Sequence, residues 1–256
     1  MTTFTPPSFA STLAFLGIVS GVLAAIVIGV SAASRRLGGP PSRRVGATAL
    51  ALGAWLAGTS AIVASGALAA APMPRIPLFF AAINLAAVAA ALSPVGRWLA
   101  TGLPLPALVA FQGFRLPLEL VLHTWAAQGT IPETMTWTGS NYDILSGLTA
   151  IALAPWASRS RTLAWAANII GLTLLVNVGR VALLSSPLPF AWPDIAPPLE
   201  LVLYLPYAWI GPVCVAGALA GHVVLTRALL LRGRGSGRVA ARPVSSRFSS
   251  ASNADG

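Results

Sequence analysis

Apolar residues fill this chain in long runs, and short polar stretches separate the runs. Seven of them approach or exceed the ~20 mostly apolar residues that a helix needs to cross the hydrocarbon core of a membrane. We therefore predict an all-α integral membrane bundle of seven transmembrane helices, with spans at 11–33, 45–71, 76–100, 103–127, 142–157, 162–184 and 198–231.

The composition supports this prediction. Hydrophobic residues make up 56% of the 256 residues, charged residues only 9%, and the mean hydropathy is +0.78. A soluble domain of this length carries far more charge. The composition therefore excludes a soluble globular protein and predicts that the lipid bilayer is a partner of this chain.

The net charge of +10 could indicate binding to nucleic acid, but the positions of the arginines argue against it. Cytoplasmic loops of membrane proteins carry the basic excess. This predicts an N-terminus outside the cell, a cytoplasmic C-terminus and no nucleic-acid partner. Thirteen of the 16 basic residues lie in alternate connections between the spans: Arg35, Arg36, Arg43, Arg44, Arg97, Arg159, Arg161 and the arginines from Arg227 to Arg247.

We divide the chain into three parts. Residues 1–10 form a short extracytoplasmic N-terminus, residues 11–231 the membrane domain, and residues 232–256 a basic cytoplasmic tail with little to bury, which we expect to be disordered. The chain has a single cysteine and no lysine. An internal disulfide and a retinal Schiff base are therefore excluded, and we predict neither a cofactor nor a metal.

The fourth span contains a charged stripe, in the stretch FRLPLELVLH at 114–123. Arg115, Glu119 and His123 are four residues apart, so in a helix they share one face over about 12 Å. A charge in the middle of a bilayer costs about 2.5–3.5 kcal/mol and is usually paired and functional. Arg115 and Glu119 are also consistent with a purely structural pair that fixes the register of the helix.

Other polar residues are expected at the same depth. Asn141 and Asp143 open the fifth span, Asn177 and Arg180 lie near the outer end of the sixth, and Glu200 opens the seventh with Tyr204 below it. Together with the stripe they predict an outward-facing polar pocket. Capping of helix ends or anchoring in the headgroups is an equally good explanation for Asp143, Arg180 and Glu200. We interpret His222 as an interfacial residue.

The charges of such a pocket do not cancel. Two arginines (Arg115 and Arg180) and three carboxylates (Glu119, Asp143 and Glu200) leave a net charge of −1, which a desolvated site does not hold without cost. Protonation of His123, protonation of a carboxylate, or a bound cation would restore the balance. Each of these leads towards handling of protons or cations.

Three runs carry a resemblance to known proteins: FRLPLELVL at 114–122, TGSNYDILSG at 138–147 and PYAWIGP at 206–212. Over roughly residues 105–230 the chain resembles a group of bacterial multispanning inner-membrane proteins without an assigned activity. The resemblance implies a bacterial inner-membrane location and a shared site around Arg115, Glu119, Asn141 and Asp143. It implies no particular chemistry.

The sequence leaves three functions open. The first is binding or transport of a small polar or cationic ligand. The second is an enzyme at the outer leaflet that uses Glu119, Asp143 and His123. The third is a structural or accessory subunit, and the sequence does not specify a protein partner for it.

The arginine distribution makes a testable prediction about topology. A reporter that is active only in the cytoplasm should work when it is fused after Arg247 or between Arg36 and Arg43, and it should be silent when it is inserted in the loop 128–141. Activity of the reporter in that loop would reverse the predicted orientation.

Overall fold

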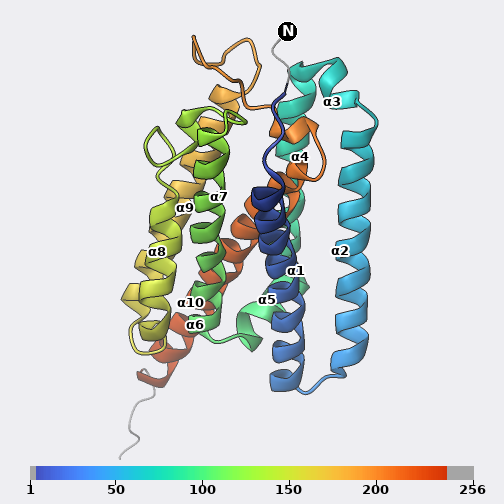
Figure 1. Ribbon diagram of the computed structural model, residues 1–256. Coiled ribbons are helices and arrows are strands. Elements are labelled where there is room, and N and C mark those ends of the chain that lie inside the picture. The colour runs from blue at the N-terminus through green and yellow to red at the C-terminus, as the bar shows by residue number, and fades with distance from the viewer. Residues whose placement is uncertain (1–3, 241–256) are drawn as a thin grey trace, which may run out of the picture.

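The structure, a computed structural model, describes residues 4–240 of the chain, with side chains for residues 4–233. Within the described residues the regular structure is helical, without strands (Figure 1). The all-α prediction is therefore confirmed. The helices are α1 (Phe9–Leu37), α2 (Pro41–Ala64), α3 (Ala67–Ala70), α4 (Pro72–Leu92), α5 (Pro94–Gly102), α6 (Leu105–Ala110), α7 (Arg115–Ala127), α8 (Ile144–Leu153), α9 (Arg161–Ser185) and α10 (Ala216–Ala240).

Six helical segments are long and apolar enough to cross a membrane, as in a multi-pass membrane protein. They are Phe9–Leu37, Pro41–Ala64, Pro72–Leu92, Leu105–Ala127, Arg161–Ser185 and Tyr207–Gly233.

The predicted fifth span is shorter than the others. Its helical part is Ile144–Trp156, which at 1.5 Å per residue covers only about 20 Å of a core that is ~30 Å thick. The polar stretch before it, 128–143, remains mostly outside helices. This segment is therefore not a full-length helix, contrary to the prediction.

Two other predicted spans have different bounds. The third ends at Leu92, because Ser93 caps the separate short helix α5 by accepting a hydrogen bond from the Val95 N–H at 3.1 Å. The seventh begins at Tyr207 rather than 198 and includes a π-helical turn at Gly211–Val215. α10 ends at Ala240, within the predicted basic tail, and residues 241–256 of that tail lie outside the described residues.

The outer surface of the bundle is apolar, which is the reverse of a soluble protein. Leu50 on α2 is 76% exposed, Leu85 on α4 is 69% exposed and Val176 on α9 is 68% exposed. Extended exposed apolar surfaces mark contact with a membrane or a partner. Together with the six long apolar helices, this surface fits helices that face lipid.

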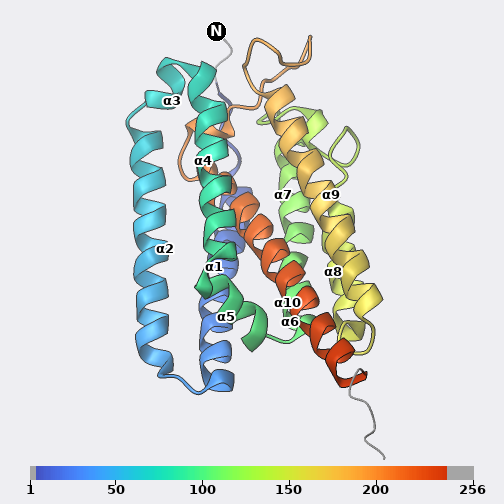
Figure 2. The ribbon, with the colours of Figure 1, turned by 180° about the vertical axis from the view of Figure 1, so that it is seen from behind.

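The path of the chain brings three segments to one end of the bundle. The start of α1 lies at the same end as the loops 128–143 and 186–206, and the last turns of α10 lie at the opposite end (Figure 1). Seen from behind, α10 runs obliquely between the α4 side and the α9 side (Figure 2). It packs against α4, α5 and α9, so it links the two halves of the bundle.

The helix that carries the charged stripe is irregular. α6 and α7 are joined by a 3₁₀ turn, Phe111–Phe114, so that 105–127 forms one broken helix. Proline lacks an N–H, so Pro117 cannot donate the hydrogen bond to the carbonyl of Gly113 that a regular α-helix has. The tighter turn just before Arg115 is a usual way to accommodate such a gap.

The crossing of α7 and α8 depends on a glycine. A Cβ atom placed on Gly147 would lie 2.7 Å from the Cβ and 2.8 Å from the Cα of Leu116 on α7. The backbone of Leu116 cannot move aside as the tip of a flexible side chain could. Gly147 therefore permits the close approach of α8 that brings Asp143 to Arg115.

We predict that Gly147→Ala destabilises the protein by about 1–3 kcal/mol through overpacking. Gly179→Ala in α9 is the matched control, because a Cβ there meets nothing within 4 Å. The measurement is thermal unfolding of both variants in detergent. Equal melting temperatures for the two variants would show that the α7–α8 crossing has room for a methyl group.

Candidate functional site

A buried ion pair forms the centre of the site. Arg115, at the start of α7, donates from Nε to Asp143 Oδ2 at 2.6 Å and from Nη2 to Asp143 Oδ1. The two side chains are 2% and 5% exposed. A two-pronged contact between a guanidinium and a carboxylate is among the strongest polar contacts in proteins. It fixes the start of α8 against α7.

Local turn chemistry holds Asp143 in place. Asn141 Oδ1 accepts a hydrogen bond from the Asp143 N–H at 3.1 Å, which is an Asx turn. Ser146, one turn into α8, donates to Asp143 Oδ1 at 3.0 Å. The carboxylate thus faces Arg115 and Ser146 and forms no side-chain cap on α8. This geometry does not support the interpretation of Asp143 as a helix cap.

Glu119 lies one turn above Arg115 on α7 and is 1% exposed. Its two carboxyl oxygens accept hydrogen bonds from Asn141 Nδ2, both at 3.1 Å. Within the described residues, the ion pair of Arg115 is with Asp143, and Glu119 has no cation within 4.0 Å. The predicted pairing of Arg115 with Glu119 is therefore wrong, because Asp143 occupies the guanidinium.

A second branch of the network leads from Arg115 towards the end where α10 terminates. Arg115 Nη1 donates to the Gly171 carbonyl at 2.9 Å and lies 3.2 Å from His222 Nε2. Arginine only donates, so His222 Nε2 accepts and Nδ1 carries the proton. Nδ1 then donates to Asn168 Oδ1 at 3.0 Å. Asn168 Nδ2 in turn donates to Thr226 Oγ1 at 2.7 Å.

This branch was missed from the sequence. His222, predicted to be interfacial, is 1% exposed and belongs to the network. Asn168 is not among the predicted site residues. Asn168 and His222 are visible in the sequence as isolated polar residues in apolar spans, but the sequence does not show that they face each other. Gly171 permits the contact, because a Cβ there would lie 2.9 Å from His222 Nε2.

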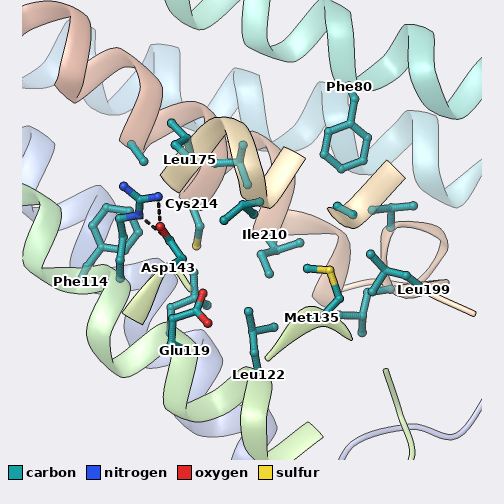
Figure 3. Close-up of a pocket in the computed structure, with 18 residues that line it drawn as sticks. Phe80, Phe114, Glu119, Leu122, Met135, Asp143, Leu175, Leu199, Ile210 and Cys214 are labelled. Carbon is teal, nitrogen blue, oxygen red and sulfur yellow. Dashed lines mark hydrogen bonds and ion pairs between the residues drawn. The ribbon is translucent and has the colours of Figure 1, made fainter. Parts of the chain in front are cut away.

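A small cavity of about 50 Å³ adjoins the ion pair. Glu119 and Asp143 reach into the space from one side, and apolar residues such as Met135, Leu199 and Ile210 surround the rest (Figure 3). A water needs ~10–15 Å³ on this kind of measure, so the cavity has room for a few waters. It is much smaller than the ~300–1,000 Å³ pockets that bind organic ligands.

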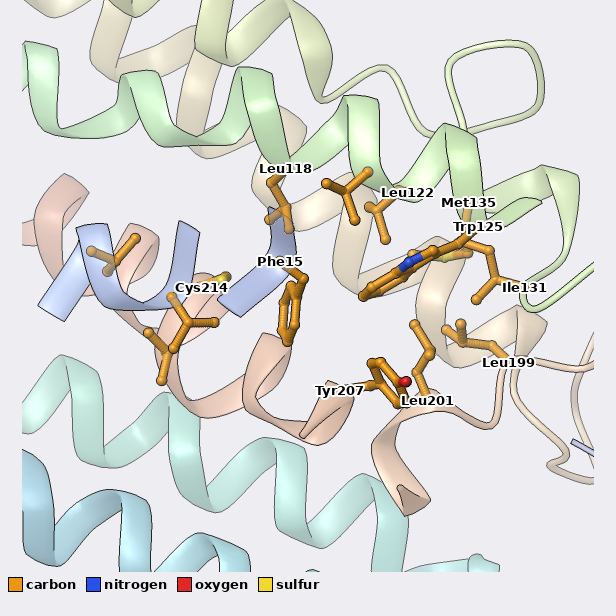
Figure 4. Close-up of a cluster of buried hydrophobic side chains, with 14 of the residues drawn as sticks. Phe15, Leu118, Leu122, Trp125, Ile131, Met135, Leu199, Leu201, Tyr207 and Cys214 are labelled. Carbon is orange, nitrogen blue, oxygen red and sulfur yellow. The ribbon is translucent and has the colours of Figure 1, made fainter. Parts of the chain in front are cut away.

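An aromatic and aliphatic cluster borders the cavity (Figure 4). Trp125 on α7 lies 5.2 Å from Phe15 of α1 and 5.5 Å from Tyr207, measured between ring centroids. Leu118 and Leu122 of α7 belong both to this cluster and to the cavity wall. The carboxyl of Glu119 therefore lies between a polar network and an apolar cluster.

Five predicted site residues lie apart from this network. His123 stacks on Trp137 with 4.2 Å between ring centroids. Asn177 donates to the carbonyl of Ser140 at 2.8 Å and holds the 128–143 loop. The other three lie nearer the surface. Arg180 is exposed and contacts Asn177 and Trp192, and Tyr204 stacks on Phe4. Glu200 is partly buried in the 186–206 loop, where desolvation raises its pKa.

The site that the structure assembles is therefore smaller and deeper than predicted. Of the nine predicted residues it brings together Arg115, Glu119, Asn141 and Asp143. It adds His222, Asn168 and Thr226 on the other side of Arg115. His123, predicted to balance the charge of Glu119 and Asp143, makes no described contact with either carboxylate.

Comparisons with protein-family models, with curated proteins and with solved structures found no match to this chain.

The geometry predicts strong energetic coupling between Arg115 and Asp143. Removing one partner of a buried ion pair costs about 3–5 kcal/mol, because the other charge is left unpaired, whereas replacing both by apolar residues can be neutral. Arg115→Met and Asp143→Leu should each lower the yield and melting temperature of the protein in detergent. The double variant should recover most of the loss.

The matched control is the double variant Arg115→Met with Glu119→Leu. These two residues are the pair that the four-residue spacing in the sequence suggests. Because Glu119 does not pair with Arg115, this combination should recover much less. Additive losses in the Arg115 and Asp143 double variant would show that the two charges have separate partners.

Proposed function

We propose that this chain is a multi-pass protein of the bacterial inner membrane that binds a proton at Glu119 as part of a transport function. In this proposal seven segments cross the membrane, with α8 and the loop before it as the fifth. The N-terminus is outside, the C-terminus is in the cytoplasm, and the cavity faces the outer half of the bundle.

The observation that carries the proposal is the unpaired carboxyl of Glu119. The charges of Arg115 and Asp143 cancel in their ion pair, and His222 is neutral in the tautomer that its contacts require. Glu119 therefore remains as a single excess negative charge, 1% exposed. An isolated carboxylate in an apolar interior is neutralised by a proton or a cation.

The surroundings of Glu119 favour a proton over a metal cation. Sodium, calcium and magnesium ions need several oxygen ligands. The carboxylate of Asp143 is held by Arg115, both oxygens of Glu119 face the amide of Asn141, and most of the cavity wall is apolar. Within residues 4–240, no three His, Cys, Asp or Glu side chains are grouped as metal ligands.

Space for water beside Glu119 and polar groups beyond Arg115 support movement of the proton rather than storage. The cavity has room for a few waters on one side. On the other side of Arg115, the chain of His222, Asn168 and Thr226 continues inside the bundle. Gln112, one turn below Arg115, has a buried Oε1 without a partner among the described groups, which a water could satisfy.

The enzyme alternative loses support from the geometry. It needs an imidazole beside Glu119 or Asp143, but His123 stacks on Trp137 instead. His222 is near, yet Arg115 and Asn168 occupy both of its ring nitrogens. The structural alternative predicts that the network stabilises the bundle and moves nothing, so a flux measurement distinguishes it from our proposal.

The test is proton flux into liposomes that contain the purified protein, driven by a potassium diffusion potential and followed with a pH-sensitive dye. Wild type should acidify the lumen faster than empty liposomes. Glu119→Gln should abolish the difference, because Gln keeps the shape and the hydrogen bond from Asn141 but cannot exchange a proton.

The matched control is Glu133→Gln, which removes an exposed carboxylate in the neighbouring 128–143 loop and should transport like wild type. Melting temperatures of both variants establish that they are folded. Wild-type flux in the Glu119 variant would refute the proposal. An absence of flux in wild type, with Glu119→Gln more stable than wild type, would favour the structural alternative.

A further inference from the structure

A second cavity lies at the opposite end of the bundle from the N-terminus, between α5 and α10. Its volume is about 320 Å³, and its lining consists of Arg97, Arg227, Leu230 and Leu231. α5 and α10 lie side by side there in both views (Figures 1 and 2). We call it the arginine cleft.

We propose that the arginine cleft binds the phosphate headgroup of an anionic phospholipid, with an acyl chain along Leu230. This site goes beyond the proton function proposed above and does not depend on it, because no residue of the Glu119 network lines the cleft.

Charge complementarity supports an anion. The acidic residues of the described chain are Glu119, Glu133, Asp143, Asp194 and Glu200, which lie in α7, at the start of α8 or in loops at the other end of the bundle (Figure 1). Within residues 4–233, therefore, no carboxylate lies at this end to neutralise the arginines.

The two arginines are arranged for different tasks. Arg227 is held in place, because its Nη1 donates to the carbonyls of Ala91 at 2.5 Å and Ser93 at 2.8 Å. Arg97 is exposed on α5, and its guanidinium forms no hydrogen bond or ion pair with another described residue. A guanidinium that is already oriented loses little freedom on binding phosphate, and a free one can complete the contact.

The surroundings of the cleft fit the membrane surface. α5 is a short helix with Arg97 followed by Trp98, and Arg44 of α2 lies 4.7 Å above the Trp98 ring. Tryptophan and arginine together are typical of the level of the headgroups. Leu230 lines the cleft and is 53% exposed, so it offers apolar surface beside the two arginines. An acyl chain would gain from such apolar surface, whereas free phosphate would not.

The experiment measures retention of phosphatidylglycerol and phosphatidylcholine by the purified full-length protein, using native mass spectrometry during lipid titration in detergent. We expect phosphatidylglycerol to bind more tightly. Arg97→Gln should weaken its binding about fivefold, the factor that corresponds to the ~1 kcal/mol gained per basic residue at an anionic surface. The variant should melt like wild type in phosphatidylcholine, because the Arg97 guanidinium forms no hydrogen bond or ion pair with a described residue and the substitution keeps the backbone hydrogen bonds.

Arg43→Gln is the matched control. It removes an exposed arginine from the same end of the bundle that does not line the cleft, and it should bind phosphatidylglycerol like wild type. Equal binding of the two lipids to wild type, or equal weakening by the two substitutions, would overturn the site in favour of diffuse attraction. Displacement of the lipid by inorganic phosphate at low concentration would overturn the lipid as the occupant.

Discussion

The cost of burying a charge in an apolar bundle governs the centre of this structure. Arg115 is 1% exposed, and each of its three nitrogens has a partner: Asp143 for Nε and Nη2, and Gly171 and His222 for Nη1. These partners belong to different segments. Satisfying one guanidinium therefore brings together α7, α8, α9 and α10, because a missing partner would leave a buried charge unpaired.

The same constraint explains why the fifth segment is not a full-length helix. Asp143 must lie beside Arg115, so the chain returns from the end of α7 into the bundle through the irregular stretch 128–143. Irregular backbone inside a membrane is tolerated only where protein satisfies it. Here the Asn141 N–H donates to the Thr136 carbonyl at 3.1 Å, and Asn177 of α9 donates to the Ser140 carbonyl at 2.8 Å. In place of further helical turns, this stretch forms a turn that positions the carboxylate of Asp143 and the amide of Asn141.

The sequence predicted what depends on local pattern. Length and hydropathy located six membrane helices, and the spacing of four placed Arg115 and Glu119 on one face. The partners of these residues come from other helices, and hydropathy does not fix the rotation or depth of one helix against another. Asn168 and His222 are 54 positions apart and meet only after α9 and α10 pack. His123 shares the predicted face, but it lies above the network and contacts Trp137.

Some of the arginines from which we predict the topology also stabilise the fold at their end of the bundle. Carbonyls at the break after α4 and just beyond the end of α5 accept hydrogen bonds from side chains of α10. Arg227 donates to Ala91 and Ser93, and Arg232 donates to Leu103 at 2.6 Å. α10 thereby holds the α4–α5 elbow. The basic residues of this end are therefore not equivalent. Arg227 and Arg232 donate to backbone carbonyls, whereas the exposed guanidinium of Arg97 makes no such contact with a described residue.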